Sequence, residues 1–142
     1  MDRLYFAYGS NLSLQQMRRR CSNAKPLRRC VLPGFKLVLR GAADVEPCAG
    51  GSVEGALYWV SQDDEAQLDS YEGVPNLYSK RTFAVEEGEA LFYQMDPPIY
   101  KEPREGYIDT IRNGFADWDI PLATLESAIR EQTARPLSTP DC

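Results

Sequence analysis

The chain has 142 residues, a formal net charge of −5 and no histidine. Its length predicts one domain with a core of its own, and its acidic balance argues against nucleic acid or a membrane surface as a partner. Without histidine, Ser-His and Cys-His nucleophile pairs are excluded, so a general acid or base near neutral pH must be a shifted carboxyl group, a shifted lysine or a tyrosine.

No apolar run approaches the roughly 20 residues that a membrane span needs, and the N-terminus does not have the layout of a signal peptide. We therefore expect a cytoplasmic protein. Its cysteines, Cys21, Cys30, Cys48 and Cys142, form no C-x-x-C pair. In that compartment free thiols are expected, with a disulfide or a redox role as the alternatives.

The first elements are a strand and a helix joined by a glycine turn. Residues 4–8 are apolar and aromatic, as in a buried strand. Ser13 begins an S-x-x-Q capping-box pattern, after which Leu14, Met17 and Cys21 follow at helical spacing. The helix ends in the basic cluster 18–20, which we interpret as a solvated helix end whose cations favour the C-terminal dipole.

The middle of the chain predicts strands and a second helix. Residues 26–40 indicate one or two strands broken at Pro33-Gly34, residues 41–52 a loop, and residues 53–60 another strand. Ser61 starts an S-x-x-D pattern, and residues 62–71 predict a short helix that ends at Gly73.

Residues 78–95 predict a hairpin around Glu86-Glu87-Gly88. The stretch 96–104 holds three prolines and predicts a loop, and helices are expected at 105–115 and, more clearly, at 120–133, where Leu122, Leu125 and Ile129 share a face. About five or six strands, mostly joined as hairpins, predict an α+β fold with a barrel-like sheet. We expect one domain over residues 1–134 and a flexible tail over 135–142.

The turn Gly9-Ser10-Asn11 has two interpretations. It can be a plain turn before a capped helix, or its backbone N–H groups and the helix dipole can hold a carboxylate or carbonyl oxygen. It lacks the spacing of a nucleotide-binding loop.

Glu72 also has two interpretations, because it stands at a helix end just before Gly73. It can be a solvated surface residue. Alternatively, the negative helix end and burial by Tyr71 and Tyr78 can raise its pKa into the range of a general base. Tyr8 and Tyr107 can likewise be core residues or pocket residues.

Three stretches together, YFAYGSNL, LDSYEGV and EPREGYIDTIRNGF, resemble the γ-glutamylcyclotransferase family over about residues 4–133. The asparagine at position 11 resembles the γ-glutamylcyclotransferase branch of the family rather than its glutathione-specific branch. The resemblance implies a small mixed fold on a closed or nearly closed barrel. It also implies a reaction in which the α-amino nitrogen of a γ-glutamyl substrate attacks its own γ-carbonyl, releasing 5-oxoproline and a free amine or amino acid.

By position, the resemblance implies Glu72 as the acid/base, and a substrate site made of Tyr8, Gly9, Ser10, Asn11, Leu12, Tyr78 and Tyr107. No cofactor or metal is implied, the partner is a small γ-glutamyl molecule, and a homodimer is left open because several family members pair. The leaving group also stays open. Two other functions compete: a member that only binds an acidic metabolite, and a protein-interaction domain that uses the face of the basic cluster 18–20.

Overall fold

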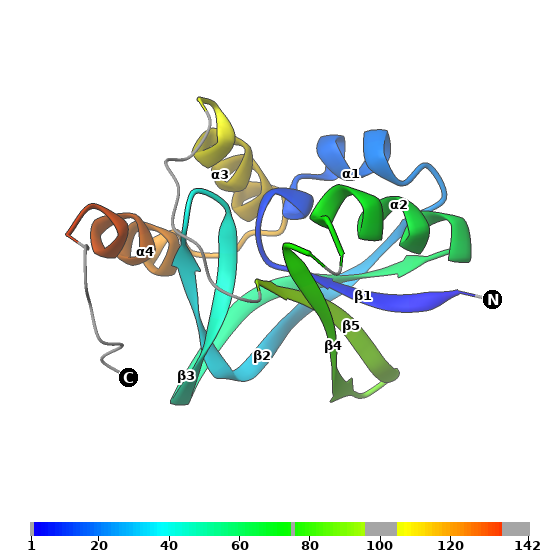
Figure 1. Ribbon diagram of the computed structural model, residues 1–142, viewed down its shortest axis with the longest axis horizontal. Coiled ribbons are helices and arrows are strands. Elements are labelled where there is room, and N and C mark those ends of the chain that lie inside the picture. The colour runs from blue at the N-terminus through cyan, green and yellow to red at the C-terminus, as the bar shows by residue number, and fades with distance from the viewer. Residues whose placement is uncertain (1, 75, 96–104, 135–142) are drawn as a thin grey trace.

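The computed structural model describes residues 2–74, 76–95 and 105–134. Its elements are β1 (Arg3–Ala7), the short helix η1 (Ser10–Leu12), α1 (Leu14–Arg20), β2 (Lys25–Leu39), β3 (Ala43–Val60), α2 (Gln62–Glu72), β4 (Tyr78–Val85), β5 (Gly88–Met95), α3 (Tyr107–Asp117) and α4 (Ala123–Ala134). The strands form one sheet in the order β2-β3-β1-β5-β4, with α1 and α2 side by side, α3 beside η1 and α4 beside β2 (Figure 1). The predicted α+β class is confirmed. The predicted loop 96–104 and tail 135–142 lie outside the described residues.

The central strand β1 explains the apolar start of the chain. It pairs antiparallel with β3, from Arg3↔Val60 to Ala7↔Ala56, and parallel with β5 at Leu4↔Ala90. From Leu4 to Ala7 its side chains are buried on both faces of the sheet, which is why the strand shows no polar alternation.

Alternation along the strands gives the sheet two aromatic faces. One face carries phenylalanines in edge-to-face contact, and the rings of Phe35 on β2 and Phe92 on β5 are 5.5 Å apart. Because β3 and β1 stand between those strands in the order, the sheet must be strongly curled. It is barrel-like but not closed into a barrel, since β2 and β4 form its two edges in the described part of the chain. The other face carries tyrosines, with Tyr5 stacked near Tyr58.

The long β2–β3 hairpin corrects the predicted loop at 41–52. Only residues 40–42 turn, and β3 then runs unbroken from Ala43 to Val60, paired with β2 at Leu39↔Ala43, Phe35↔Pro47 and Pro33↔Ser52. β2 is not broken at Pro33, but its register shifts between Pro33 and Phe35. Ladder hydrogen bonds with β2 override the weak strand preference of this Gly- and Ala-rich segment.

Local capping chemistry was predictable at α1 and α2. The Ser13 hydroxyl accepts from the Gln16 N–H at 3.2 Å, and Ser61 and Asp64 form a reciprocal capping box. Gly73 ends α2 with a φ of 67°. In α4, Leu125 is fully buried as predicted, whereas Leu122 precedes the helix and is 43% exposed.

The cysteines divide into two groups. Cys21 and Cys30 are free thiols, as expected, but Cys48 is disulfide-bonded, which corrects the expectation for that residue. Cys142 lies outside the described residues. Among the described residues, we find no helix with the length and apolar character needed to span a membrane.

Gly114 on α3 offers a test of how closely α3 lies on η1. A Cβ there would stand 2.5 Å from Leu12 Cβ and 2.6 Å from the Ser13 nitrogen. Alanine favours an exposed helix position by about 1 kcal/mol over glycine, but a clash with backbone costs about 1–3 kcal/mol or more. Gly114→Ala should therefore lower the free energy of unfolding in urea.

The control is Asn113→Ala on the exposed face of the same helix, which should leave the unfolding midpoint nearly unchanged. If Gly114→Ala unfolds at the wild-type urea concentration, α3 does not pack on η1 at these distances.

Candidate functional site

A cavity of about 540 Å³ lies where the end of β1, the end of α2, the tip of the β2–β3 hairpin and the start of α3 meet. This volume suits a small molecule. All but one of the predicted site residues line it: Tyr8, Gly9, Ser10, Asn11, Glu72, Tyr78 and Tyr107. Segments far apart in the sequence therefore meet at one cavity. The turn at residues 9–11 and Glu72 must do so if both are to bind one substrate.

Leu12 is the exception. Its side chain is fully buried in the core and faces Gly114 of α3, while its carbonyl accepts a hydrogen bond from Trp118 Nε1 at 2.8 Å. The predicted substrate residue Leu12 therefore does not line the cavity, and it anchors the loop to α3. A loop residue next to the site had to turn inward to hold the loop in place.

The loop leaves two donors for a ligand. Its internal bonds use the Leu12 N–H, which donates to Gly9 O at 3.0 Å, and the Ser13 N–H, which donates to Ser10 O at 3.1 Å. Within the described ranges the N–H groups of Ser10 and Asn11 have no protein partner, and both residues line the cavity. A Cβ on Gly9 would stand 2.8 Å from Ala43 Cβ, so glycine lets the loop approach the β2–β3 hairpin.

The first turn of α1 directs two of its N–H groups to protein acceptors. The Leu14 N–H donates to Asp117 Oδ2 at 2.9 Å, and Ser13 caps the Gln16 N–H. These two N–H groups are therefore not available to a ligand, whereas those of Ser10 and Asn11 in the preceding loop are.

A positively charged side chain lines the cavity, that of Arg20 at the C-terminal end of α1. Its Nη1 donates to Ser10 Oγ and to Asn11 Oδ1, and its guanidinium carbon lies 3.4 Å from the ring centroid of Tyr71. Arg18 and Arg19 are exposed, as predicted for a solvated helix end, whereas Arg20 is half-buried and lines the cavity.

Sequence reasoning missed Arg20 among the three arginines, although one signal was present. Arg20 follows the buried Met17 by three residues, and this spacing places both on one face of the helix.

Glu72 is the last residue of α2, and its carboxyl group faces the cavity. Burial raises its pKa to about 7, against the lowering effect of Arg20 and with a small further rise from Asp44. Tyr71, which the sequence suggested as a residue that helps to bury Glu72, is itself 59% exposed and packs on Arg20. Tyr78 is buried, as expected.

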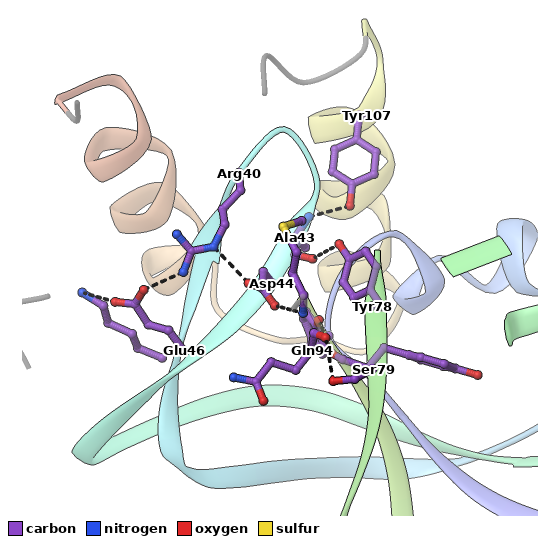
Figure 2. Close-up of polar contacts among 12 residues, drawn as sticks. Arg40, Ala43, Asp44, Glu46, Tyr78, Ser79, Gln94 and Tyr107 are labelled. Carbon is purple, nitrogen blue, oxygen red and sulfur yellow. Dashed lines mark hydrogen bonds and ion pairs between the residues drawn. The ribbon is translucent and has the colours of Figure 1, made fainter. Parts of the chain in front are cut away.

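Tyr78 and Tyr107 hold the hairpin tip against the cavity (Figure 2). The Tyr78 hydroxyl donates to Ala43 O at 2.8 Å, and the Tyr107 hydroxyl accepts from Ala43 N at 2.8 Å. Burial raises the pKa of Tyr107 to about 12, so it stays protonated at neutral pH. Both predicted tyrosines therefore line the cavity and also fix its wall.

Asp44, the next residue on β3, ties the hairpin tip to β5. Its Oδ1 accepts from the Met95 N–H at 2.8 Å and its Oδ2 from Arg40 Nε at 3.0 Å (Figure 2). Arg40 also donates to Glu46 at 2.7 Å. In the part of the chain that the structure describes, no cluster of His, Cys, Asp and Glu is arranged to hold a metal ion.

The electrostatics of Glu72 can be measured directly. We expect a carboxyl carbon NMR titration to give a Glu72 pKa near 7. Removing the opposing cation with Arg20→Gln should raise that pKa further, because only burial and Asp44 then act on the group. Arg19→Gln, on the exposed face of α1, is the control and should leave it unchanged. A Glu72 pKa near that of a free glutamate would contradict the burial described here.

The comparisons with known proteins agree with this geometry. A family model described as "Gamma-glutamyl cyclotransferase, AIG2-like" matches residues 5–118. Among curated proteins, no match was found.

Solved structures share the fold. One described as a gamma-glutamyl cyclotransferase has a TM-score of 0.72 at 23% identity, covering 100% of this chain and 92% of its own. A Homo sapiens protein described as uncharacterized has a TM-score of 0.75 at 24% identity, with 99% and 94% covered. YkqA from Bacillus subtilis has a TM-score of 0.70 at 23% sequence identity, and the match covers 96% of this chain and 56% of YkqA. The family match over most of the chain establishes that this protein belongs to the AIG2-like gamma-glutamyl cyclotransferase family.

Proposed function

We propose that this protein is an active γ-glutamyl cyclotransferase, which converts a γ-glutamyl amino acid or amine into 5-oxoproline and the free amine. The observation that carries the proposal is a carboxyl group with a pKa of about 7, Glu72, in a cavity that is also lined by Ser10 and Asn11, whose N–H groups have no partner in the described part of the chain. A proton acceptor poised near neutrality and donors for a developing anion are the two features that this cyclisation needs.

The reaction begins with proton removal. The substrate's α-ammonium group cannot attack until it loses a proton, and the Glu72 carboxylate accepts it. The α-nitrogen then forms a bond to the γ-carbonyl carbon, and the carbonyl oxygen becomes an oxyanion. The N–H groups of Ser10 and Asn11 are the donors that we assign to this charge; removing one such donor typically costs about 100-fold to 1,000-fold in rate.

Collapse of this intermediate breaks the bond from the γ-carbon to the leaving nitrogen. Protonated Glu72 returns its proton to that nitrogen, so the carboxylate is regenerated. The second proton lost by the α-nitrogen goes to solvent, and the released amine takes one up in turn. Every non-hydrogen atom of the products comes from the substrate, so the scheme needs no protein nucleophile.

Ring closure within one molecule makes orientation the main task of the cavity. Holding the two reacting groups of the substrate together can be worth roughly 7–11 kcal/mol of the barrier. The fixed walls, built by Tyr78, Tyr107 and Asp44 around the hairpin tip, support such a role. A domain that only binds an acidic metabolite is served poorly by Glu72, because its ionised form would repel the anion above about pH 7.

Replacing the base tests the proposal. Glu72→Gln should lower 5-oxoproline formation by at least about 100-fold, the usual loss for a removed acid/base group, while substrate still binds. The assay measures 5-oxoproline from γ-glutamyl dipeptides, γ-glutamyl-ε-lysine and glutathione. Glu89→Gln, at an exposed position on β5, is the control and should retain full activity. The enzyme proposal fails if the wild type forms no 5-oxoproline from any of them at high enzyme concentration.

The pH dependence follows from the same group. Because the base must be ionised to accept a proton, kcat/KM should rise about tenfold per pH unit below 7 and level off above about 7. Initial rates across this range measure the profile. A flat profile between pH 5 and about 7 would mean that Glu72 is not the titrating base.

A further inference from the structure

Tyr5 on β1 lines the cavity, but it has no part in the reaction steps described above. Its side chain is buried, with 4% exposed. Its hydroxyl oxygen accepts a hydrogen bond from Asn11 Nδ2 at 2.9 Å, and its ring packs near the rings of Tyr58 and Tyr93, with centroid distances of 6.4 Å and 5.9 Å. The phenol is therefore held in place beside the loop at residues 9–11.

The hydrogen bonds of Asn11 decide where the Tyr5 proton can go. Because a guanidinium can only donate, the side-chain oxygen of Asn11 must face Arg20, and its NH2 group must face Tyr5. An NH2 group also only donates, so Tyr5 is the acceptor in that bond. The Tyr5 O–H remains to donate, and we find no acceptor for it in the described part of the chain.

The other buried tyrosines of the cavity differ from Tyr5 in this respect. Three of them already donate their proton to a protein oxygen at 2.6–2.8 Å, namely Tyr8, Tyr78 and Tyr93. Tyr107 accepts from the Ala43 N–H and shares a hydrogen bond with the side chain of Ser10. A buried donor without an acceptor costs free energy, so the Tyr5 hydroxyl is suited to an acceptor that a ligand supplies.

The bond from Asn11 also makes the Tyr5 hydroxyl a stronger donor. Arg20 donates to Asn11 and Asn11 donates to Tyr5, and the bonds of such a chain polarise one another. The last donor of the chain therefore suits an acceptor that gains negative charge. In the proposed reaction that acceptor is the γ-carbonyl oxygen of the substrate, to which we have already assigned the backbone N–H of Asn11.

We propose that Tyr5 is a catalytic residue whose hydroxyl donates a hydrogen bond to the oxyanion that forms from the γ-carbonyl oxygen. This inference rests on the proposed cyclotransferase function and deepens its mechanism. The bond strengthens as charge develops on the oxygen and weakens when the intermediate collapses. The phenol keeps its proton throughout, because burial raises the pKa of Tyr5 well above neutral pH.

Tyr5→Phe removes the hydroxyl group and keeps the ring. With γ-glutamyl-alanine as the substrate, we expect kcat to fall by about 100-fold, a typical loss for one oxyanion donor, with little change in KM. The midpoint of the pH profile should stay at about 7, because Glu72 remains the titrating base. Urea unfolding checks that the variant is folded.

Tyr58→Phe is the matched control. Tyr58 stacks near Tyr5 and also bonds the loop, donating to Asn11 O at 3.1 Å, but it is not among the described residues that line the cavity. A loss of rate that arises from a disturbed loop would appear in this variant as well. We expect Tyr58→Phe to lose far less activity than Tyr5→Phe.

A binding measurement checks that the cavity is intact. Calorimetry on Glu72→Gln protein, with and without Tyr5→Phe, measures the affinity for γ-glutamyl-alanine without turnover. We expect equal affinities, because the oxyanion does not form in the bound substrate. Much weaker binding with Tyr5→Phe would show that the hydroxyl binds the substrate before the reaction, which contradicts the proposed role.

The kinetics can also overturn the inference. A Tyr5→Phe variant with full activity has lost no donor to the oxyanion, and a higher pH midpoint would mean that the hydroxyl donates to the Glu72 carboxylate instead. An equal loss with Tyr58→Phe would make the role structural. Each of these results leaves the cyclotransferase proposal intact, whereas a wild type that forms no 5-oxoproline removes both proposals.

Discussion

The cavity depends on the backbone of one residue, Ala43, at the tip of the β2–β3 hairpin. Tyr78 on β4 and Tyr107 on α3 bind its carbonyl and its N–H, and Asp44 beside it binds the Met95 N–H of β5. Each buried hydrogen bond adds only about 1 kcal/mol net, but leaving one unmade costs about 1–3 kcal/mol. These bonds therefore hold the tip of the long hairpin against the loop after β1, which glycine at position 9 lets come close.

Most of the fold could be predicted where local chemistry decides it. Ser13, Ser61 and Gly73 cap helices as their types predict, and the turn at Glu86-Glu87 joins β4 and β5 as expected. The start of β3 could not be predicted, because its Gly-, Ala- and Pro-containing sequence becomes a strand only through pairing with β2. Sheet curvature is likewise a property of contacts between distant strands, such as Phe35 with Phe92.

The residues of the candidate site likewise divide into those that local sequence could predict and those that it could not. Glu72 and the loop at 9–11 were found from short motifs and from the resemblance those motifs carry, and they do line one cavity. Two assignments depended on which way a side chain points in the folded chain. Leu12 turns into the core beneath α3, and Arg20, in a run that reads as a solvated helix end, turns inward. A run of like charges gives no information on which member faces a cavity unless the buried neighbours at helical spacing are considered.

The outer strand β2 has a consequence for behaviour in concentrated solution. It stands at the sheet edge, with Leu27 and Val31 exposed, and such an edge can recruit strands from other chains. Pro26 and Pro33 offer no N–H for such pairing, and the register shifts beside each of them disturb its regular geometry. The charged side chains of Arg28 and Arg29, which pair with Glu87 and Glu54, make this edge less apolar. The features that bend β2 around the core thus also protect the protein against aggregation through this edge.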